Sequence, residues 1–287
     1  MLNKVIYHLK VIKSQTIADP INNGYKIKLA SDYIQWLLFY KHKNRDWLIK
    51  FDNGYKSTVK PYPDHDSGSM NIWTRNVDYL EIEFIRKQLQ KGDWIIDGGC
   101  NVGNRTWAMA DLLGGAILVD ANPKAIARTR ENLRLNGLPE DKYILVENAL
   151  GDKPGVIRFS DRGGARTDNR ILPEGEEEGS VSMEMTTIDL LVSTYKIRPA
   201  FIKLDVEGYD YFALKGAEQT LRSGAVKLVK FEILDFSTFG QFKEFFSSIG
   251  WRLFALTEKG QPVADEGFFE KQLNLFAAPA AVCAKYL

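Results

Sequence analysis

From about residue 90 onward, short β-branched runs alternate with segments of helical pattern, and no other feature constrains the fold of this chain more. The expected strands cover 94–97, 116–120, 143–150, 201–206, 226–234, 251–256 and 273–279, with further strand character at 156–160 and 180–188. Helices are expected over 104–113, 123–136, 209–223 and 238–249. Repeated βαβ units of this kind predict an α/β fold with a mostly parallel sheet.

The first 74 residues have a different pattern. The segments YKIKLA, WLLFYK and DWLIKFDNGYKSTV suggest strands, with turns at Asn23–Gly24 and Asn53–Gly54. We therefore predict a small β-rich appendage over 1–74 and a main domain over 75–287 that opens with a helix at about 75–90. The polar segment 163–180 is expected to be a loop, either a solvated insertion or a lid over the site.

Composition narrows the possible partners. Lys and Arg number 38 against 37 Asp and Glu, a net charge of +1, which gives no electrostatic reason to expect nucleic acid or an anionic membrane as partner. The two cysteines form no CxxC pattern, which argues against a disulfide framework and structural zinc. No signal peptide and no membrane-spanning run of about 20 apolar residues is expected. We expect a cytoplasmic protein that acts on a small molecule; its oligomeric state is left open.

A cluster of glycines follows the first strand of the alternating region, in the segment Asp97–Gly103, DGGCNVG. In a doubly wound sheet, a Gly-rich turn at this place lets a ligand approach the backbone closely. Gly99 and Gly103 permit positive φ. Asp97 ends the strand, where it can orient the turn or reach a ligand's ammonium group through water.

Asp120 ends the second strand, where a carboxylate can accept hydrogen bonds from both hydroxyls of a ribose. This feature alone also fits nicotinamide enzymes. Those enzymes use GxGxxG, which seats a pyrophosphate on a helix N-terminus. The spacing here is GGCNVG, so an NAD-type oxidoreductase is the less favoured interpretation, and a cofactor without phosphates fits better.

Several blocks, in order, resemble the FkbM-type methyltransferases, a branch of the class I S-adenosylmethionine-dependent enzymes. They are DGGCNVGNRT, VDANPKAIARTRENLRLNG, ENALGDKPGVIRFS, and MTTIDLL followed by IKLDVEGYDYFALKGAEQTL. The resemblance covers about 75–280. It implies a Rossmann-like class I methyltransferase sheet that is mostly parallel with an antiparallel last strand. It also implies S-adenosyl-L-methionine as cofactor, and O-methylation of a hydroxyl on a sugar, glycan or secondary-metabolite precursor.

Carried over by position, the resemblance implies a set of cofactor-binding residues. Asp97, Gly99, Asn101 and Gly103 would shape the methionine end of the pocket, and Asp120 would hold the ribose. Asn122 would line the same loop, and Asn148 with Ala149 would lie beside the adenine. Two of these have alternatives in the sequence itself, because Asn122 could cap the helix that starts at Pro123 and Asn148 could close a turn.

The candidates for the chemistry lie at the carboxyl ends of the fourth and fifth expected strands. Asp205 and Glu207, in LDVEGYD, are expected to be catalytic. If both lie on one face of a strand, they could bind a divalent cation such as Mg²⁺, or one could act directly as a base. Glu232 could hydrogen-bond a polyol substrate, and His65, in the loop PYPDHDSG, could overhang the site.

The leading interpretation is therefore an S-adenosylmethionine-dependent methyltransferase. Besides the oxidoreductase, a noncatalytic Rossmann-like binding protein remains an alternative of another class. The presence of Asp97, Gly99, Gly103, Asp120 and Asp205 together argues against a degenerate site.

Overall fold

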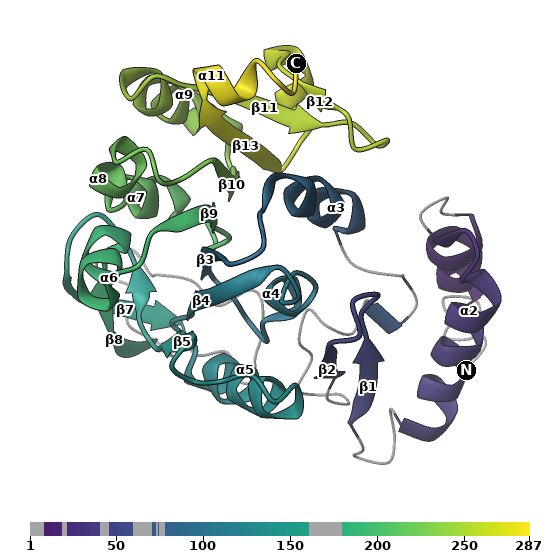
Figure 1. The fold of residues 1–287 in the computed structure, drawn as a ribbon. Coiled ribbons are helices and arrows are strands. Elements are labelled where there is room, and N and C mark those ends of the chain that lie inside the picture. Colours follow the sequence, from purple (N-terminus) through teal and green to yellow (C-terminus); the bar gives the residue numbers. More distant parts are fainter. Residues whose placement is uncertain are drawn as a thin grey trace.

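A computed structural model of the chain describes residues 9–18, 22–40, 46–59, 71–72, 74, 78–160 and 180–287. The strands of its central sheet are β3 (Asp93–Gly98), β4 (Leu113–Val119), β5 (Tyr143–Val146), β9 (Pro199–Lys203), β10 (Leu228–Glu232), β11 (Trp251–Leu256), β12 (Pro262–Val263) and β13 (Asn274–Pro279). They form an eight-stranded sheet in the order β12-β11-β13-β10-β9-β3-β4-β5 (Figure 1). All seven strands expected for this sheet are present.

Strand directions follow the class I pattern implied by the resemblance. Strand β3 pairs in parallel with β4 on one side and β9 on the other, and β5 and β10 extend these pairs in parallel. The last strand, β13, lies antiparallel between β10 and β11. The chain order of the strands reverses at the β3–β9 pair, which is the topological switch point of the sheet. Ligands of such sheets bind at the switch point, beyond the carboxyl ends of the strands. The Rossmann-like fold class is thereby confirmed.

Apolar side chains alternate between the two faces of the sheet. Ile95 packs on one face and Ile96 on the other, as do Phe201 and Ile202. The first face is covered by α3 (Tyr79–Gln88), α4 (Asn104–Trp107), α5 (Pro123–Leu135) and α11 (Ala280–Cys283). The second is covered by α6 (Ile188–Tyr195), α7 (Asp210–Lys215), α8 (Glu218–Arg222), α9 (Phe239–Ser248) and α10 (Glu266–Phe269), with the short 3-10 helix η5 (Phe236–Thr238) before α9.

The N-terminal region contains both helices and strands. Strands β1 (Trp47–Lys50) and β2 (Lys56–Val59) form the hairpin expected around Asn53–Gly54. The strands expected at YKIKLA and WLLFYK are wrong, because these segments lie in α2 (Lys26–Gln35) and the π-helix η3 (Trp36–Tyr40), after a further π-helix, η1 (Ile12–Ile17). Leu29, Tyr33 and Trp36 are buried, and their spacing has the helical period that short windows of sequence concealed.

The hairpin is hydrogen-bonded to the main domain. The backbone N–H of Thr58 donates to Asn132 Oδ1 at 3.0 Å, and the backbone N–H of Lys56 donates to Asn136 Oδ1 at 2.7 Å. Helix α2, by contrast, lies at the right edge of the view in Figure 1. A division of the chain at residue 74 remains a prediction. In the described residues, no helix has both the length and the apolar character needed to cross a membrane.

A second, three-stranded sheet is formed by β6 (Ala149–Leu150), β7 (Gly155–Ser160) and β8 (Ser180–Thr186), in the order β6-β8-β7. The strand expected over 143–150 is thus divided: β5 belongs to the main sheet, whereas β6 pairs with β8. Most of the loop expected over 163–180 lies outside the described residues.

Candidate cofactor and acceptor site

The turn after β3, residues 98–103, is called the glycine turn below. It packs against the backbone that follows β9. Gly99 has a φ of +67°, and a Cβ atom there would lie 1.9 Å from the carbonyl oxygen of Asp205. Gly103 has a φ of +79°, and a Cβ there would lie 2.5 Å from the Trp107 ring. Both positions therefore require glycine for conformation and for space. Asn101, between them, is also left-handed, with a φ of 50°.

Backbone amides hold the carboxylate of Asp120, which directly follows β4. The N–H of Asn101 donates to Oδ2 and the N–H of Asn122 donates to Oδ1, each at 2.8 Å. Burial raises the pKa of Asp120 to about 6, although both amides and Lys203 oppose the shift. Each oxygen accepts one backbone hydrogen bond and retains lone-pair capacity for a ligand hydroxyl.

The remaining predicted cofactor residues differ in their surroundings. Asn122 is buried and caps α5, accepting a hydrogen bond from the backbone N–H of Lys124 at 3.0 Å, so the capping alternative is confirmed. Asn148 follows β5 at the same edge of the sheet as Asp120, and its Nδ2 lies 3.5 Å from Glu184 Oε2. Ala149 is buried in β6. Contact of these three with a cofactor stays a prediction.

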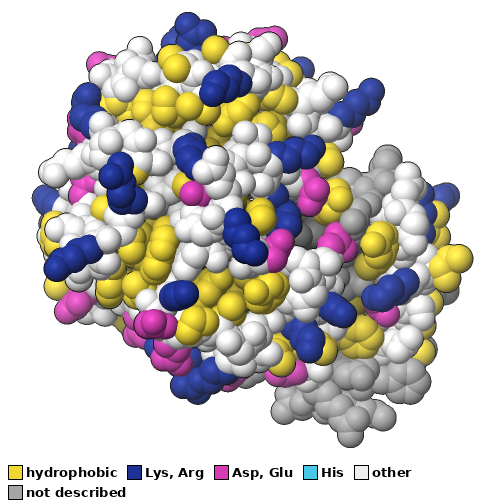
Figure 2. Space-filling model, viewed as in Figure 1, with side chains coloured by type: hydrophobic (Ala, Val, Ile, Leu, Met, Phe, Trp, Pro, Cys, Tyr) yellow, Lys and Arg dark blue, Asp and Glu magenta, His cyan; other side chains and the backbone are white. Residues whose placement is uncertain are grey.

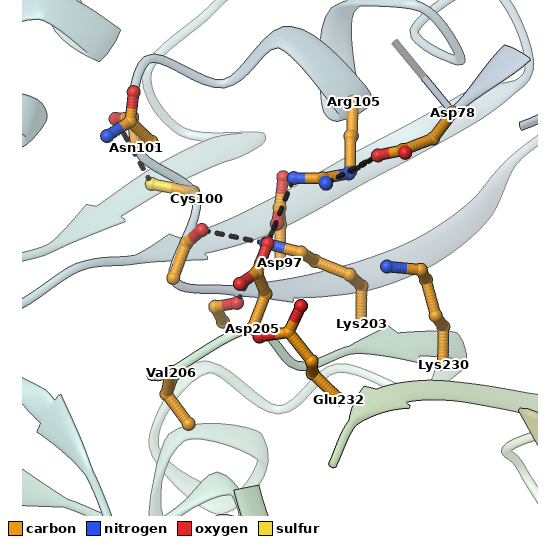
Figure 3. Close-up of polar contacts among 12 residues, drawn as sticks. Asp78, Asp97, Cys100, Asn101, Arg105, Lys203, Asp205, Val206, Lys230 and Glu232 are labelled. Carbon is orange, nitrogen blue, oxygen red and sulfur yellow. Dashed lines mark hydrogen bonds and ion pairs between the residues drawn. The ribbon is translucent and has the colours of Figure 1, made fainter. Parts of the chain in front are cut away.

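A cluster of charged side chains lies next to the glycine turn (Figure 3). Asp97 and Lys203 are buried, whereas Asp78, Arg105 and Asp205 are partly exposed. Lys203 is only 2% exposed. Its Nζ lies 3.2 Å from Asp97 Oδ1 and donates to the Gly99 carbonyl at 2.7 Å. Burial would lower the pKa of Lys203, but Asp97 and Asp205 outweigh it and raise the value. Lys203 therefore remains charged and holds the glycine turn through its hydrogen bonds to the carbonyls of Gly98 and Gly99.

The carboxylate of Asp97 is buried and is held by the side chains of Thr106 and Lys203. It is 2% exposed, and its Oδ2 accepts a hydrogen bond from Thr106 Oγ1 at 2.7 Å. Of the two roles expected for Asp97, these contacts are those of a group that orients the turn. A contact with the cofactor's ammonium stays a prediction.

Asp205 is held as an anion by two cations. Its Oδ2 lies 3.1 Å from Arg105 Nη1 and 3.5 Å from Lys203 Nζ. Burial would raise the pKa of Asp205, yet the attraction of Lys203, Arg105 and Lys230 prevails and lowers it to about 2. On its other side, Arg105 donates to Asp78, which directly precedes α3.

Sequence reasoning missed Arg105 and Asp78. The sequence did hold a signal for Arg105, which is a cation in an expected helix whose other residues, such as Thr106, Trp107 and Met109, are apolar or small. A cation within such a segment needs anionic partners. Nothing local marks Asp78 as its partner, since the pair forms only when α3 and α4 pack together.

The expectation that Asp205 and Glu207 share a strand face is wrong. Strand β9 ends at Lys203, so both residues lie in the connection to α7, and Glu207 has a left-handed φ of 53°. The alternation of side chains along a strand does not apply there. A catalytic role for each residue stays a prediction.

Asp210, at the start of α7, is the third residue that sequence reasoning missed. It is buried, and its carboxylate accepts the backbone N–H of Val206 at 3.1 Å and of Glu232 at 2.9 Å. Burial raises its pKa to about 7. Asp210 thus ties the segment after Asp205 to the end of β10, and its position within DVEGYD was the available signal.

Glu232 ends β10 and is half-buried, as expected for a residue on the ligand side. Its carboxylate lies beside that of Asp205 in Figure 3. Burial and the neighbouring Asp205 raise its pKa. The neighbouring Lys230 points toward α3 instead, where its Nζ lies 3.3 Å from Glu81 Oε2.

Two further expectations concern His65 and a metal ion. His65 lies outside the described residues. Within the described part of the chain, no group of three or more His, Cys, Asp or Glu side chains is arranged to hold a metal. The two cations at Asp205 Oδ2 would also repel a divalent ion, so the predicted Mg²⁺ has no donor set in this part of the chain.

The fold and this site define a class: a doubly wound α/β domain with a glycine turn at the switch point and an acid after the second strand. Residues 97–260, more than half of the chain, match the family described as methyltransferase FkbM domain. The chain therefore belongs to the FkbM methyltransferase family, and the matched segment is an S-adenosylmethionine-dependent methyltransferase domain.

Solved structures that resemble this chain share little sequence with it. An FkbM methyltransferase from Methylobacillus flagellatus KT is 14% identical with a TM-score of 0.46, over 65% of this chain and 43% of that one. A precorrin-6y C5,15-methyltransferase from Geobacter metallireducens GS-15 is 12% identical with a TM-score of 0.38, over 70% of this chain and 87% of that one. A tRNA (uracil-54, C5)-methyltransferase from Pyrococcus abyssi, in complex with S-adenosyl-L-homocysteine, is 10% identical with a TM-score of 0.43, over 81% and 43%. The chain spans less than half the length of the first and third.

Proposed function

We propose that this protein transfers a methyl group from S-adenosylmethionine to a hydroxyl on a sugar, a glycan or a secondary-metabolite precursor, in the cytoplasm. Family membership supports methyl transfer. The observation that carries the assignment of the site is the pair of acids beside the glycine turn: Asp120 on the β4 side and Asp205 on the β9 side.

The residues present fit a compact cationic cofactor. Gly99 packs directly against the Asp205 carbonyl, which brings the β9 side of the site close to the glycine turn. Asp120, on the other side, retains lone-pair capacity for two ribose hydroxyls. When bound, S-adenosylmethionine supplies an electrophilic methyl group on a sulfonium. A pyrophosphate fits less well, because α4 spans only four residues and so offers a short dipole, while Asp205 and Glu232 would repel its charge.

On the acceptor side, Asp205 and Glu207 follow the carboxyl end of β9, and Glu232 is the last residue of β10. A hydroxyl acceptor must be aligned with the methyl group and must lose its proton during transfer. Carboxylates can orient the hydroxyl and receive that proton without a metal ion. We propose Asp205 and Glu207 as catalytic residues and Glu232 as a substrate contact.

The charge distribution favours a small or glycan acceptor over nucleic acid. On the face shown in Figure 2, acidic and basic side chains are interspersed rather than gathered into a basic stripe. The net charge of +1 agrees with this distribution. Nucleic-acid binding draws mainly on concentrated positive charge.

Calorimetry with three ligands tests the proposed function. S-adenosylmethionine and S-adenosylhomocysteine are expected to bind, and NAD⁺ is not. Transfer of labelled methyl groups to a panel of methyl glycosides, polyols and phenols then tests for O-methylation. Binding of NAD⁺ alone would favour the oxidoreductase, whereas binding of S-adenosylhomocysteine without transfer to any hydroxyl would favour a noncatalytic protein or another acceptor atom.

A further inference from the structure

Asp205 and Glu232 lie side by side at the switch point but differ in what holds them. Arg105 Nη1 and Lys203 Nζ both lie within 3.5 Å of Asp205 Oδ2. A carboxylate that is held so firmly as an anion is a poor proton acceptor, because its conjugate acid is too strong. Asp205 is suited to orient a hydroxyl or a cation, and its low proton affinity makes it unsuited to remove a proton.

Glu232 has the opposite surroundings. Within the part of the chain that the structure describes, its carboxylate has no hydrogen bond or ion pair with a protein group. The charged or titratable groups that face it are Asp205, Lys230, Arg105, Lys203 and Asp210. It is half-buried, so its surroundings favour the protonated form more than water does, while the side chain stays within reach of a ligand.

The backbone of Glu232 is nevertheless fixed. Its N–H donates to Asp210 Oδ1 at 2.9 Å, and the same carboxylate accepts the N–H of Val206, next to Asp205. Asp210 therefore sets the separation between the two acids at the backbone and leaves the Glu232 side chain to meet a ligand. This arrangement differs from that of a structural acid, whose carboxylate would itself be paired.

We propose that Glu232 is the residue that accepts the proton of the acceptor hydroxyl, while Asp205 remains ionised and orients that hydroxyl. This inference rests on the proposed function. The hydroxyl oxygen forms the new C–O bond, and the C–S bond breaks with its electron pair remaining on sulfur. The O–H bond breaks, its electron pair stays on the oxygen, and the proton passes to a carboxylate oxygen of Glu232.

Carboxyl labelling tests this inference without an identified acceptor. The full chain, loaded with S-adenosylhomocysteine, is treated at about pH 6 with a water-soluble carbodiimide and glycine methyl ester, which modify accessible protonated carboxyl groups. Trypsin cleavage after Lys203 and Lys230 places Asp205 and Glu232 on different peptides. Asp235, which is exposed and shares a peptide with Glu232, is an internal reference.

Glu232 is expected to carry at least about tenfold more label than Asp205, and more than Asp235, because its pKa is raised whereas theirs are lowered. Equal labelling of Glu232 and Asp205, or an unlabelled Glu232, would overturn the inference, since the proton acceptor must be both reachable and protonatable. Calorimetry on the same sample separates the two failures: absence of S-adenosylhomocysteine binding contradicts the proposed function itself.

Kinetics with any glycoside of the panel that is methylated give a second readout. Glu232→Gln should lower kcat about 100-fold and abolish the acidic limb of the kcat pH profile, with KM for S-adenosylmethionine unchanged. Glu244→Gln, an exposed acid on α9, is the matched control and should behave as wild type. If the acidic limb persists in Glu232→Gln, another group takes the proton.

Discussion

Two carboxylates lie on either side of β3, and they are held by different means. Backbone N–H groups from two loops hold Asp120, whose pKa rises to about 6. Two buried or half-buried cations hold Asp205, whose pKa falls to about 2. Burial acts in the same direction on both, so the difference comes from their partners.

The partners of Asp120 fix its position, whereas the partners of Asp205 also fix its protonation state. Amide dipoles fix where Asp120 lies but are too weak to offset its burial, so its charge depends on pH near neutrality. Full charges on Lys203 and Arg105 keep Asp205 ionised at any physiological pH. The β4 side of the site is therefore built for position, and the β9 side for charge.

Removing the central cation should have the largest effect on the β9 side. Lys203→Met leaves Asp97 and Asp205 without their shared partner and is expected to lower the free energy of unfolding by about 4 kcal/mol, as loss of one member of a buried ion pair typically does. Urea denaturation measures this. The double variant Lys203→Met/Asp97→Asn should regain part of the loss; a single variant as stable as wild type would show that the cluster is dispensable.

The glycine turn joins the two sides, so adding one methyl group there should disturb both. Gly99→Ala must displace the Asp205 carbonyl, and we expect a loss of about 3 kcal/mol in stability, with S-adenosylhomocysteine affinity reduced more than about 100-fold. Gly137→Ala is the matched control, because its φ is also positive but nothing lies within 4 Å. It should cost about 1 kcal/mol. Equal losses in the two variants would refute the close approach.

The charge of Asp205 can be removed without changing its shape. Asp205→Asn should slow methyl transfer about 100-fold, because the acceptor loses its orienting anion, and should change S-adenosylhomocysteine affinity less than about threefold. Steady-state kinetics and calorimetry measure the two effects. An unchanged turnover would contradict a role for Asp205 in the chemistry.

The pH dependence of ligand binding reports on Asp120. Ribose hydroxyls favour the ionised carboxylate, so S-adenosylhomocysteine affinity should weaken by up to about tenfold per pH unit below about 6. Asp120→Asn should lose this dependence. The stability of the ligand-free protein should show the opposite trend. Because folding raises the pKa of Asp120 to about 6, this residue's contribution to stability is lost as the pH rises from about 4 through 6. A flat affinity profile in the wild type would contradict the assignment.

The smallest effect is expected from metal removal. Arg105 and Lys203 already pair with Asp205 Oδ2 and would repel a divalent ion there. Treatment with a chelator should leave methyl transfer within about twofold of its initial rate. Loss of activity that Mg²⁺ restores would show that an ion binds despite these cations.

Features set by local sequence could be predicted. The apolar runs of β3, β4 and β9, the glycine turn and the acid after β4 all follow from residue type and spacing. The helix α2 was missed because short windows hid its period. The pairing of Arg105 with Asp205 joins residues 100 positions apart, and only the packing of α4 against the switch point brings them together.

In the function proposed above, the glycine turn and Asp120 form the S-adenosylmethionine pocket. Calorimetric titration of the wild type and Asp120→Ala with S-adenosylhomocysteine tests it most directly, with thermal unfolding as a check of the fold. We expect one site per chain in the wild type and an affinity at least about tenfold weaker in the variant, because the variant loses charged hydrogen bonds to the ribose. Equal affinities, or no binding to a folded wild type, would contradict it.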